Sequence, residues 1–416
     1  MREHSQPLDL EEALTQIRDE LVPTQSVETI PVASALGRVL AESVRAPVDL
    51  PPFPASAMDG YALALPEDGN VDSKFYTVIG ESLAGHPYES NNPVQIGECV
   101  RVFTGGVCPA GTNQVIPQEE VDRLEAGTVS FQAHIPTESF VRPVGHDISA
   151  GALLLERGCR LDAFAVGSLA AAGQTSCTVY AKITVGVFST GDELVDATVK
   201  PEDLQPGQIY DSNRITVLNL LSTEPCNLLD LGRLPDDAQS TTNALRTAAA
   251  ECDFLITSGG VSVGDADFVT AAIAELGELS FWKLNLKPGK PLAFGRIGAC
   301  VLFGLPGNPV STIVTLLLVA KPALRHVCGV QKEEKSVITT ATLNGRLAHT
   351  PGRAEYQRGS ARWDGNRLVV SSTGDQASNR LSSFRNSNCL IHLPKDAHDL
   401  PDASVVEVLL FEGILS

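Results

Sequence analysis

The sequence is poor in basic residues, and this scarcity limits the partners that the chain can bind. Its 416 residues hold 31 lysines and arginines against 50 aspartates and glutamates, which gives a formal net charge of −19. Nucleic acids and anionic membrane surfaces attract proteins mainly through positive charge on the protein. We therefore predict that the chain binds neither nucleic acid nor membranes.

Long apolar runs and a secretory signal are also missing. The strongest apolar run covers only residues 313–320, well short of the ~18 residues that a bilayer span requires. The opening residues, MREHSQPLDLEEAL, contain no apolar segment of the kind that secretory signals carry. The sequence thus predicts neither a membrane span nor export.

Cysteine and histidine spacings exclude two further classes. The nine cysteines are an odd number without a Cys-x-x-Cys pair, which argues against a disulfide scaffold and a zinc ribbon. The eight histidines show no spacing typical of a catalytic zinc site. A reducing compartment fits this usage best, and we predict a cytoplasmic protein.

The length predicts two to four domains at roughly 150 residues each. Apolar spacing predicts a helix over residues 10–21, short strands over 61–135 and a second helical segment over 161–172. We expect the two helical stretches to pack together around an inserted β-rich unit. The resulting division is residues 1–48 with 148–180 (helical/mixed linking domain), 49–147 (inserted β-rich domain), 181–331 (α/β domain) and 332–416 (C-terminal β domain).

Between residues 181 and 331, apolar strands alternate with amphipathic helices. Strands are predicted at 183–188, 226–232, 253–258 and 300–305, and helices at 213–221, 237–250, 267–276 and 310–318. Near-continuous apolar strands indicate a mostly parallel sheet with helices on both faces. The fold class is therefore α/β plus β, with a three-layer α/β domain.

Ligands of such sheets bind beyond the carboxyl ends of the strands. The four exits here carry glycines, prolines and acids, and they include Ser189, Thr190, Gly191, Glu193, Asp236, Asp237, Ser258, Gly259, Gly260, Ser262, Gly264, Asp265, Asp267, Pro306, Gly307 and Asn308. Glycine backbone N–H groups can approach an anion closely, although the same loop can be a simple strand-to-helix turn. We interpret the four exits together as a binding site.

Two charged groups extend this hypothesis. The carboxylates at the exits could hold Mg²⁺, which uses one or two carboxylates with water and phosphate, or they could simply cap helices. Residues 281–296 contain Lys283, Lys287, Lys290 and Arg296 without any acid. In so acidic a chain this segment favours an anion site over a solvated strand edge.

Several strings together resemble one family, the molybdopterin molybdenumtransferases, which include MoeA proteins and the gephyrin E domain. The strings occur in order over about 260 residues: PPFPASAMDGYA (51–62), RVFTGG (101–106), GHDIS (145–149), STGDEL (189–194), GQIYDSNR (207–214), TSGGVSVGDAD (257–267), FWKLNLKPGKPLAFG (281–295) and GLPGNPVS (304–311). Two departures are Pro235 before Asp236-Asp237, and Pro54-Ala55. The first leaves open which of the two aspartates acts.

The resemblance implies an elongated protomer with an inserted β domain and a C-terminal β-barrel. It also implies a homodimer whose active cleft lies between protomers, with the upstream adenylyltransferase and molybdoenzyme acceptors as possible partners. The implied reaction inserts molybdate into adenylylated molybdopterin, releases AMP and requires Mg²⁺. The alternatives are a molybdopterin adenylyltransferase and a non-enzymatic gephyrin-like scaffold.

Carried over position by position, the family's functional residues fall into three sets. The resemblance implies catalytic roles for Asp59, Thr104, Glu193, Asp236 and Asp267, and metal binding by Glu193, Asp236 and Asp267. It implies substrate binding by Asp147, Lys283, Lys287 and Ser311, in addition to the strand-exit residues given above.

Overall fold

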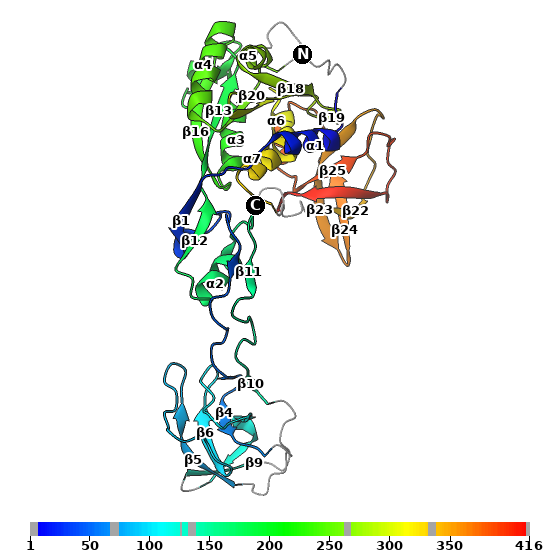
Figure 1. Ribbon diagram of the computed structural model, residues 1–416. Coiled ribbons are helices and arrows are strands. Elements are labelled where there is room, and N and C mark those ends of the chain that lie inside the picture. The colour runs from blue at the N-terminus through cyan, green and yellow to red at the C-terminus, as the bar shows by residue number, and fades with distance from the viewer. Residues whose placement is uncertain are drawn as a thin grey trace.

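The computed structural model describes residues 7–66, 75–124, 127–131, 139–261, 268–331 and 338–412. The molecule is elongated, with the α/β domain beside a C-terminal barrel at one end and the inserted β domain at the other (Figure 1). A slender linking region joins the two ends, so the inserted domain lies far from the α/β sheet of its own chain.

A six-stranded sheet forms the centre of the α/β domain. Its order is β16 (Cys226–Leu234), β13 (Ile183–Thr190), β17 (Phe254–Ser258), β21 (Cys300–Leu305), β20 (Pro291–Ile297) and β18 (Glu278–Lys283). The first four strands are parallel, β20 pairs antiparallel with β21, and β18 pairs antiparallel with β20. The predicted mostly parallel sheet is therefore confirmed, with an antiparallel edge.

Helices cover both faces of this sheet because its strands are apolar on both sides. One face packs against α1 (Leu10–Glu20), α3 (Ser212–Leu221), α6 (Pro309–Thr315) and α7 (Lys321–Val327). The other face packs against α4 (Ala238–Glu251) and α5 (Phe268–Leu276). Asp9 and Glu12 form the predicted capping box at the start of α1.

The predicted helix at 310–318 ended too early. Helix α6, a π-helical segment (Leu316–Ala320) and α7 run on from Pro309 to Val327, a length and composition that could cross a membrane. Of the most apolar 18-residue window, 83% is buried inside the fold. This helix is a core element of the α/β domain.

The linking region is built by segments far apart in the sequence. Strand β1 (Val27–Pro31) pairs with β12 (Ser176–Tyr180), and β2 (Val44–Arg45) pairs with β11 (Leu153–Leu155). Helix α2 (Ala163–Ala171) packs on them through Ala165 and Leu169. The first and later stretches of the chain therefore pack together through these strands and α2, but the predicted helix at 10–21 does not take part, because α1 packs on the α/β sheet and on α7.

Two β structures complete the chain. The inserted sheet has the order β7 (Gln114–Pro117), β4 (Gly60–Leu63), β6 (Glu98–Val102), β5 (Phe75–Ser82), β9 (Thr128–Phe131) and β8 (Val121–Arg123), and β3 (Ala55–Ser56) pairs with β10 (Val141–Arg142) nearby. The C-terminal strands are β22 (Ile338–Leu343), β23 (Ala354–Asp364), β24 (Arg367–Ser372), β25 (Cys389–Leu393) and β26 (Val405–Leu410). Pairing of β23 with both β24 and β25 closes these five strands into a barrel, and β19 (Leu286–Lys287) attaches to β23.

Candidate functional site

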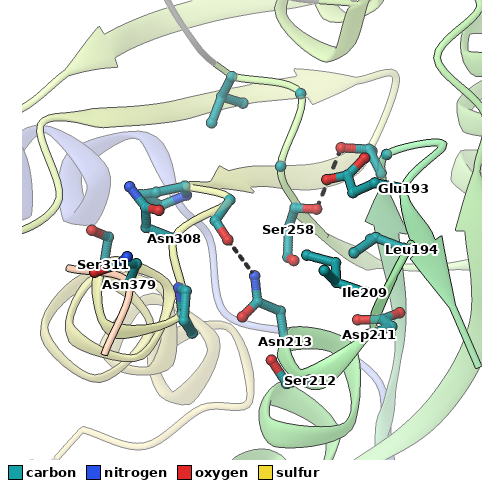
Figure 2. A pocket seen from close by; sticks show the side chains of 18 of the residues that line it. Glu193, Leu194, Ile209, Asp211, Ser212, Asn213, Ser258, Asn308, Ser311 and Asn379 are labelled. Atoms are coloured by element: carbon teal, nitrogen blue, oxygen red, sulfur yellow. Dashed lines mark hydrogen bonds between the residues drawn. The ribbon is translucent and has the colours of Figure 1, made fainter. Parts of the chain in front are cut away.

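A cleft of about 720 Å³ lies at the carboxyl edge of the parallel strands. The strand exits place eleven of the predicted residues around it: Thr190, Gly191, Glu193, Asp236, Ser258, Gly259, Gly260, Pro306, Gly307, Asn308 and Ser311. Figure 2 shows Glu193 on one side of this cleft, Asn308 and Ser311 on the other, and Ser258 between them. The rule that parallel strands collect ligands at this edge therefore predicted the position of the cleft.

Asp236 and Asp237 are adjacent in the sequence, but their side chains have different surroundings. The Asp237 carboxylate caps α4 by accepting a hydrogen bond from Ser240 N at 2.7 Å, and hydrogen bonding to Ser240 lowers its pKa. Asp236 lines the cleft, and among the described residues its carboxylate accepts one hydrogen bond, from Asp192 N at 3.1 Å. Asp236 is the member of the pair that faces the site.

The two glycines after β17 fit tightly against the end of β13. Gly259 has a φ of +92°, and a Cβ there would lie 2.5 Å from Thr190 Oγ1 and 2.9 Å from its carbonyl oxygen. The Gly259 N–H donates to the Leu305 carbonyl at 2.9 Å, so it is not available to an anion. This N–H instead holds β17 to the end of β21, and anion binding by the glycine loop as a whole stays a prediction.

This packing makes Gly259→Ala a test of local strain. We expect the substitution to lower the free energy of unfolding by about 1–3 kcal/mol, since the new Cβ clashes with Thr190 in a backbone conformation unsuited to alanine. Gly167 in α2 is the control: nothing lies within 4 Å of its Cβ position, so Gly167→Ala should stabilise by ~0.5–1 kcal/mol. Urea unfolding measures both. If the two substitutions changed the free energy of unfolding equally, the predicted strain at Gly259 would be contradicted.

Ser258 brings an unsatisfied hydroxyl to the cleft. Its side chain is 1% exposed, and its Oγ has no hydrogen-bond partner among the described residues. A buried hydroxyl without a partner costs free energy that a ligand acceptor or donor can recover. The neighbouring Ser189 differs, because it lies below the cleft and donates to Asp211 Oδ2 at 2.5 Å.

Carboxylates give the cleft its metal-binding potential. Glu193 and Asp236 both line it, and carboxylate oxygens are the ligands that Mg²⁺ prefers. Within the described ranges no group of three acidic, histidine or cysteine side chains is close enough to hold a metal by itself. Asp267, the third predicted ligand, lies outside the described residues, as do Ser262, Gly264 and Asp265.

Several cleft residues were not predicted. They come from the start of α3 (Asp211, Ser212, Asn213), from the short strands before it (Leu194, Ile209, Tyr210), and from the barrel (Asn379, Leu381). Asn213 Nδ2 donates to the Gly307 carbonyl at 2.7 Å and so ties α3 to the loop after β21 (Figure 2). The string GQIYDSNR pointed to α3, whereas no local signal marks Asn379.

The predicted lysines do not line the cleft. Lys287 pairs with the buried Glu355 of the barrel, with an Nζ–Oε1 distance of 3.1 Å. Lys283 ends β18 and likewise is not among the cleft residues. Within one chain, the lysine-bearing segment thus fastens the barrel to the α/β domain through Lys287.

Asp59 and Thr104 meet in the inserted domain. Asp59 Oδ1 accepts hydrogen bonds from Thr104 N and Oγ1, both at 2.8 Å, and these two bonds lower the pKa of Asp59. Asp147 lies where the inserted domain joins the linking region, with its N–H donating to the Leu50 carbonyl at 2.9 Å. The structure brings none of these three residues to the cleft of the same chain.

Comparisons with known proteins cover most of the chain. Three family models match: the MoeA N-terminal region (domain I and II) over residues 8–173, the "Probable molybdopterin binding domain" over 186–326, and the MoeA C-terminal region (domain IV) over 340–411. The chain is similar to the molybdopterin molybdenumtransferase of Haemophilus influenzae, with 38% identity over 98% of this chain and 100% of that protein.

Two further comparisons, one with a curated protein and one with a solved structure, also cover most of the chain. The chain is 32% identical to gephyrin of Dictyostelium discoideum over 93% of its own length and 60% of that protein. Among solved structures, the molybdopterin biosynthesis MoeA protein of Pyrococcus horikoshii superposes with a TM-score of 0.82 at 28% identity, covering 97% of this chain and all of that one.

Proposed function

The chain belongs to the MoeA family of molybdopterin molybdenumtransferases, and on that premise we propose that it inserts molybdate into adenylylated molybdopterin with release of AMP. The observation that carries the proposal is the strand-edge cleft, which combines the carboxylates of Glu193 and Asp236 with a Ser258 hydroxyl that has no partner among the described residues.

The cleft suits a substrate that carries phosphates. The hydroxyl of Ser258 can donate to a phosphate oxygen, and Asn213 fixes the loop at Gly307 that forms the opposite wall. In the reaction an oxygen nucleophile attacks phosphorus, the phosphoanhydride P–O bond breaks, and AMP leaves with the bonding electrons. Catalysis then depends on positioning and on charge neutralisation, so no covalent protein nucleophile is needed.

Mg²⁺ fits the oxygen donors of this cleft. Glu193 and Asp236 would hold the ion, with Asp267 as a possible third ligand, and the bound ion supplies positive charge against the phosphates. The carboxylates would fix the position of the ion, and Gly191 allows the Glu193 carboxylate to fold back against the strand exit.

The separation of Asp59 and Thr104 from the cleft is the reason to propose a homodimer. Since both residues carry family motifs, we infer that the inserted domain of one protomer faces the α/β cleft of the other. We expect the dimer to act in the cytoplasm, between an adenylyltransferase that supplies its substrate and molybdoenzymes that accept its product.

The test is AMP release by the purified chain. With adenylylated molybdopterin, molybdate and Mg²⁺, we expect AMP and active molybdenum cofactor in equal amounts, and removal of Mg²⁺ by a chelator should abolish both. Pyrophosphate release from ATP and molybdopterin would support the adenylyltransferase alternative instead. A folded dimer that yields no AMP would contradict the proposal.

A further inference from the structure

A second hollow lies on the inserted domain, about 550 Å³ in volume. It opens over three neighbouring strands and a fourth at the sheet edge, and its walls are Tyr61 on β4, Arg101 with Phe103 at the end of β6, residues 78–81 on β5, and Arg123 on β8. None of these residues belongs to the strand-edge cleft of the α/β domain.

Arg101 is held rigidly in this hollow. Its guanidinium lies over the rings of Tyr61 and Phe103, with Cζ 4.9 and 5.1 Å from the ring centroids. Its Nη2 donates to Gln118 Oε1 at 2.5 Å. Two rings and one hydrogen bond therefore fix the guanidinium plane, and little conformational entropy would be lost when a ligand binds it.

The same guanidinium keeps unused hydrogen-bonding capacity. Arg101 Nη1 is enclosed by the protein but has no hydrogen-bond partner among the described residues. In the described ranges, neither Arg101 nor Arg123 forms an ion pair with a carboxylate, although Glu81 opposes Arg101 in the register of β5 and β6. A charged donor without an acceptor is costly, and a ligand oxygen that reaches Nη1 through a small shift of the enclosing side chains would relieve that cost.

The charges of the side chains that line the hollow indicate which class of ligand it binds. Two arginines and a single glutamate line this hollow within a chain whose net charge is −19, and, after the hydrogen bonds from Thr104, the charge of Arg101 also lowers the pKa of the neighbouring Asp59. A guanidinium offers a planar fork of N–H donors that matches the oxygens of phosphate. Both rings that face Arg101 are already covered by it, so they do not provide a free stacking surface for a nucleobase.

We propose that this hollow binds a phosphate-type oxyanion, with Arg101 donating to its oxygens and Arg123 adding positive charge from β8. The bound anion lies next to the Asp59–Thr104 pair, because Thr104 follows Phe103 directly and the Gln118 N–H donates to the Asp59 carbonyl at 2.9 Å. Binding at this hollow requires only an oxyanion and the folded inserted domain, so it can be measured separately from AMP release.

The test measures anion binding directly. Full-length protein in phosphate-free buffer is titrated calorimetrically with inorganic pyrophosphate and, separately, with AMP. Hydrogen exchange of the peptide covering residues 98–107 then locates the bound anion. We expect pyrophosphate to protect this peptide, and Arg101→Gln to weaken that binding about tenfold or more through loss of the charged donor. Protection by AMP as well would identify a nucleotide phosphate as one source of the anion.

Three variants keep the test decisive. Arg157→Gln is the matched control, because Arg157 also lies over a tyrosine ring, at 5.7 Å from the Tyr180 centroid, but in the linking region. It should bind as the wild type does. Arg101→Lys retains the charge and should bind with intermediate strength, and Arg123→Gln changes an exposed residue without threatening the fold. Absence of protection in the wild type, or unchanged binding in all Arg101 and Arg123 variants, would overturn the proposal.

Discussion

Asp236→Ala is expected to reduce kcat/KM for AMP release at least about a hundredfold and to leave the stability of the protein nearly unchanged. The Asp236 carboxylate faces the cleft and, among the described residues, accepts one hydrogen bond, from a backbone N–H, so its loss removes little structure. Removal of a single group that stabilises charge in an active site commonly costs 10²–10³ in rate.

The adjacent residue provides the matched control. Asp237→Ala removes the N-cap of α4, where the carboxylate accepts from Ser240 N, and should cost about 1 kcal/mol of stability with little change in turnover. AMP release and urea unfolding are measured for both variants. The assignment is reversed if Asp237→Ala loses turnover while folded and Asp236→Ala does not.

The position of the cleft could be predicted from the sequence because its causes are local. Apolar strands such as β17 alternate with helices, and the carboxyl ends of parallel strands necessarily meet at one edge. Likewise, Asp237 precedes a helix and caps it, an alternative that helix electrostatics and N-cap preferences had already raised.

What could not be predicted depends on contacts between distant segments. Asn379 reaches the cleft because its barrel loop docks on α6, where Val310 N donates to the Ser378 carbonyl at 3.0 Å. The positive segment around Lys287 indicated anion binding, but Glu355 lies 68 residues further on and pairs with Lys287. No spacing rule connects these positions, since tertiary packing alone brings them together.

A second large effect is expected at a buried ion cluster beneath the α/β domain. Glu224, which precedes β16, is fully enclosed and contacts two bases of α7: Lys321 at 3.1 Å, and Arg325 through two hydrogen bonds of 2.9 Å. Arg160 of the linking region donates to the adjacent Thr223 carbonyl at 2.6 Å. The cluster therefore lies where the linking region joins the α/β domain.

The pH dependence of this cluster follows from the pKa of Glu224. Burial by itself raises that pKa, but the hydrogen bonds and charges of Arg325, Lys321 and Arg160 outweigh burial, and the net effect lowers it. A carboxyl whose pKa is lower in the folded than in the unfolded state stabilises the fold at pH values above its unfolded pKa of ~4.3. The stabilisation is lost as the pH falls through the folded pKa.

Glu224→Gln is therefore expected to lower the free energy of unfolding by about 3–5 kcal/mol at pH 7, because it removes the buried negative charge that faces Lys321 and Arg325. The difference from the wild type should shrink as the pH falls below the unfolded pKa of ~4.3 and through the lower folded pKa, where the wild-type carboxyl becomes protonated. Asp364→Asn, which removes an exposed partner of Arg367 at 3.8 Å, serves as the control and should cost less than ~1 kcal/mol throughout. Urea unfolding at pH 7 and at a descending series of acidic pH values measures both variants. A Glu224→Gln effect that is small at pH 7, or that does not shrink along the series, would show that the cluster does not stabilise the junction through its charges.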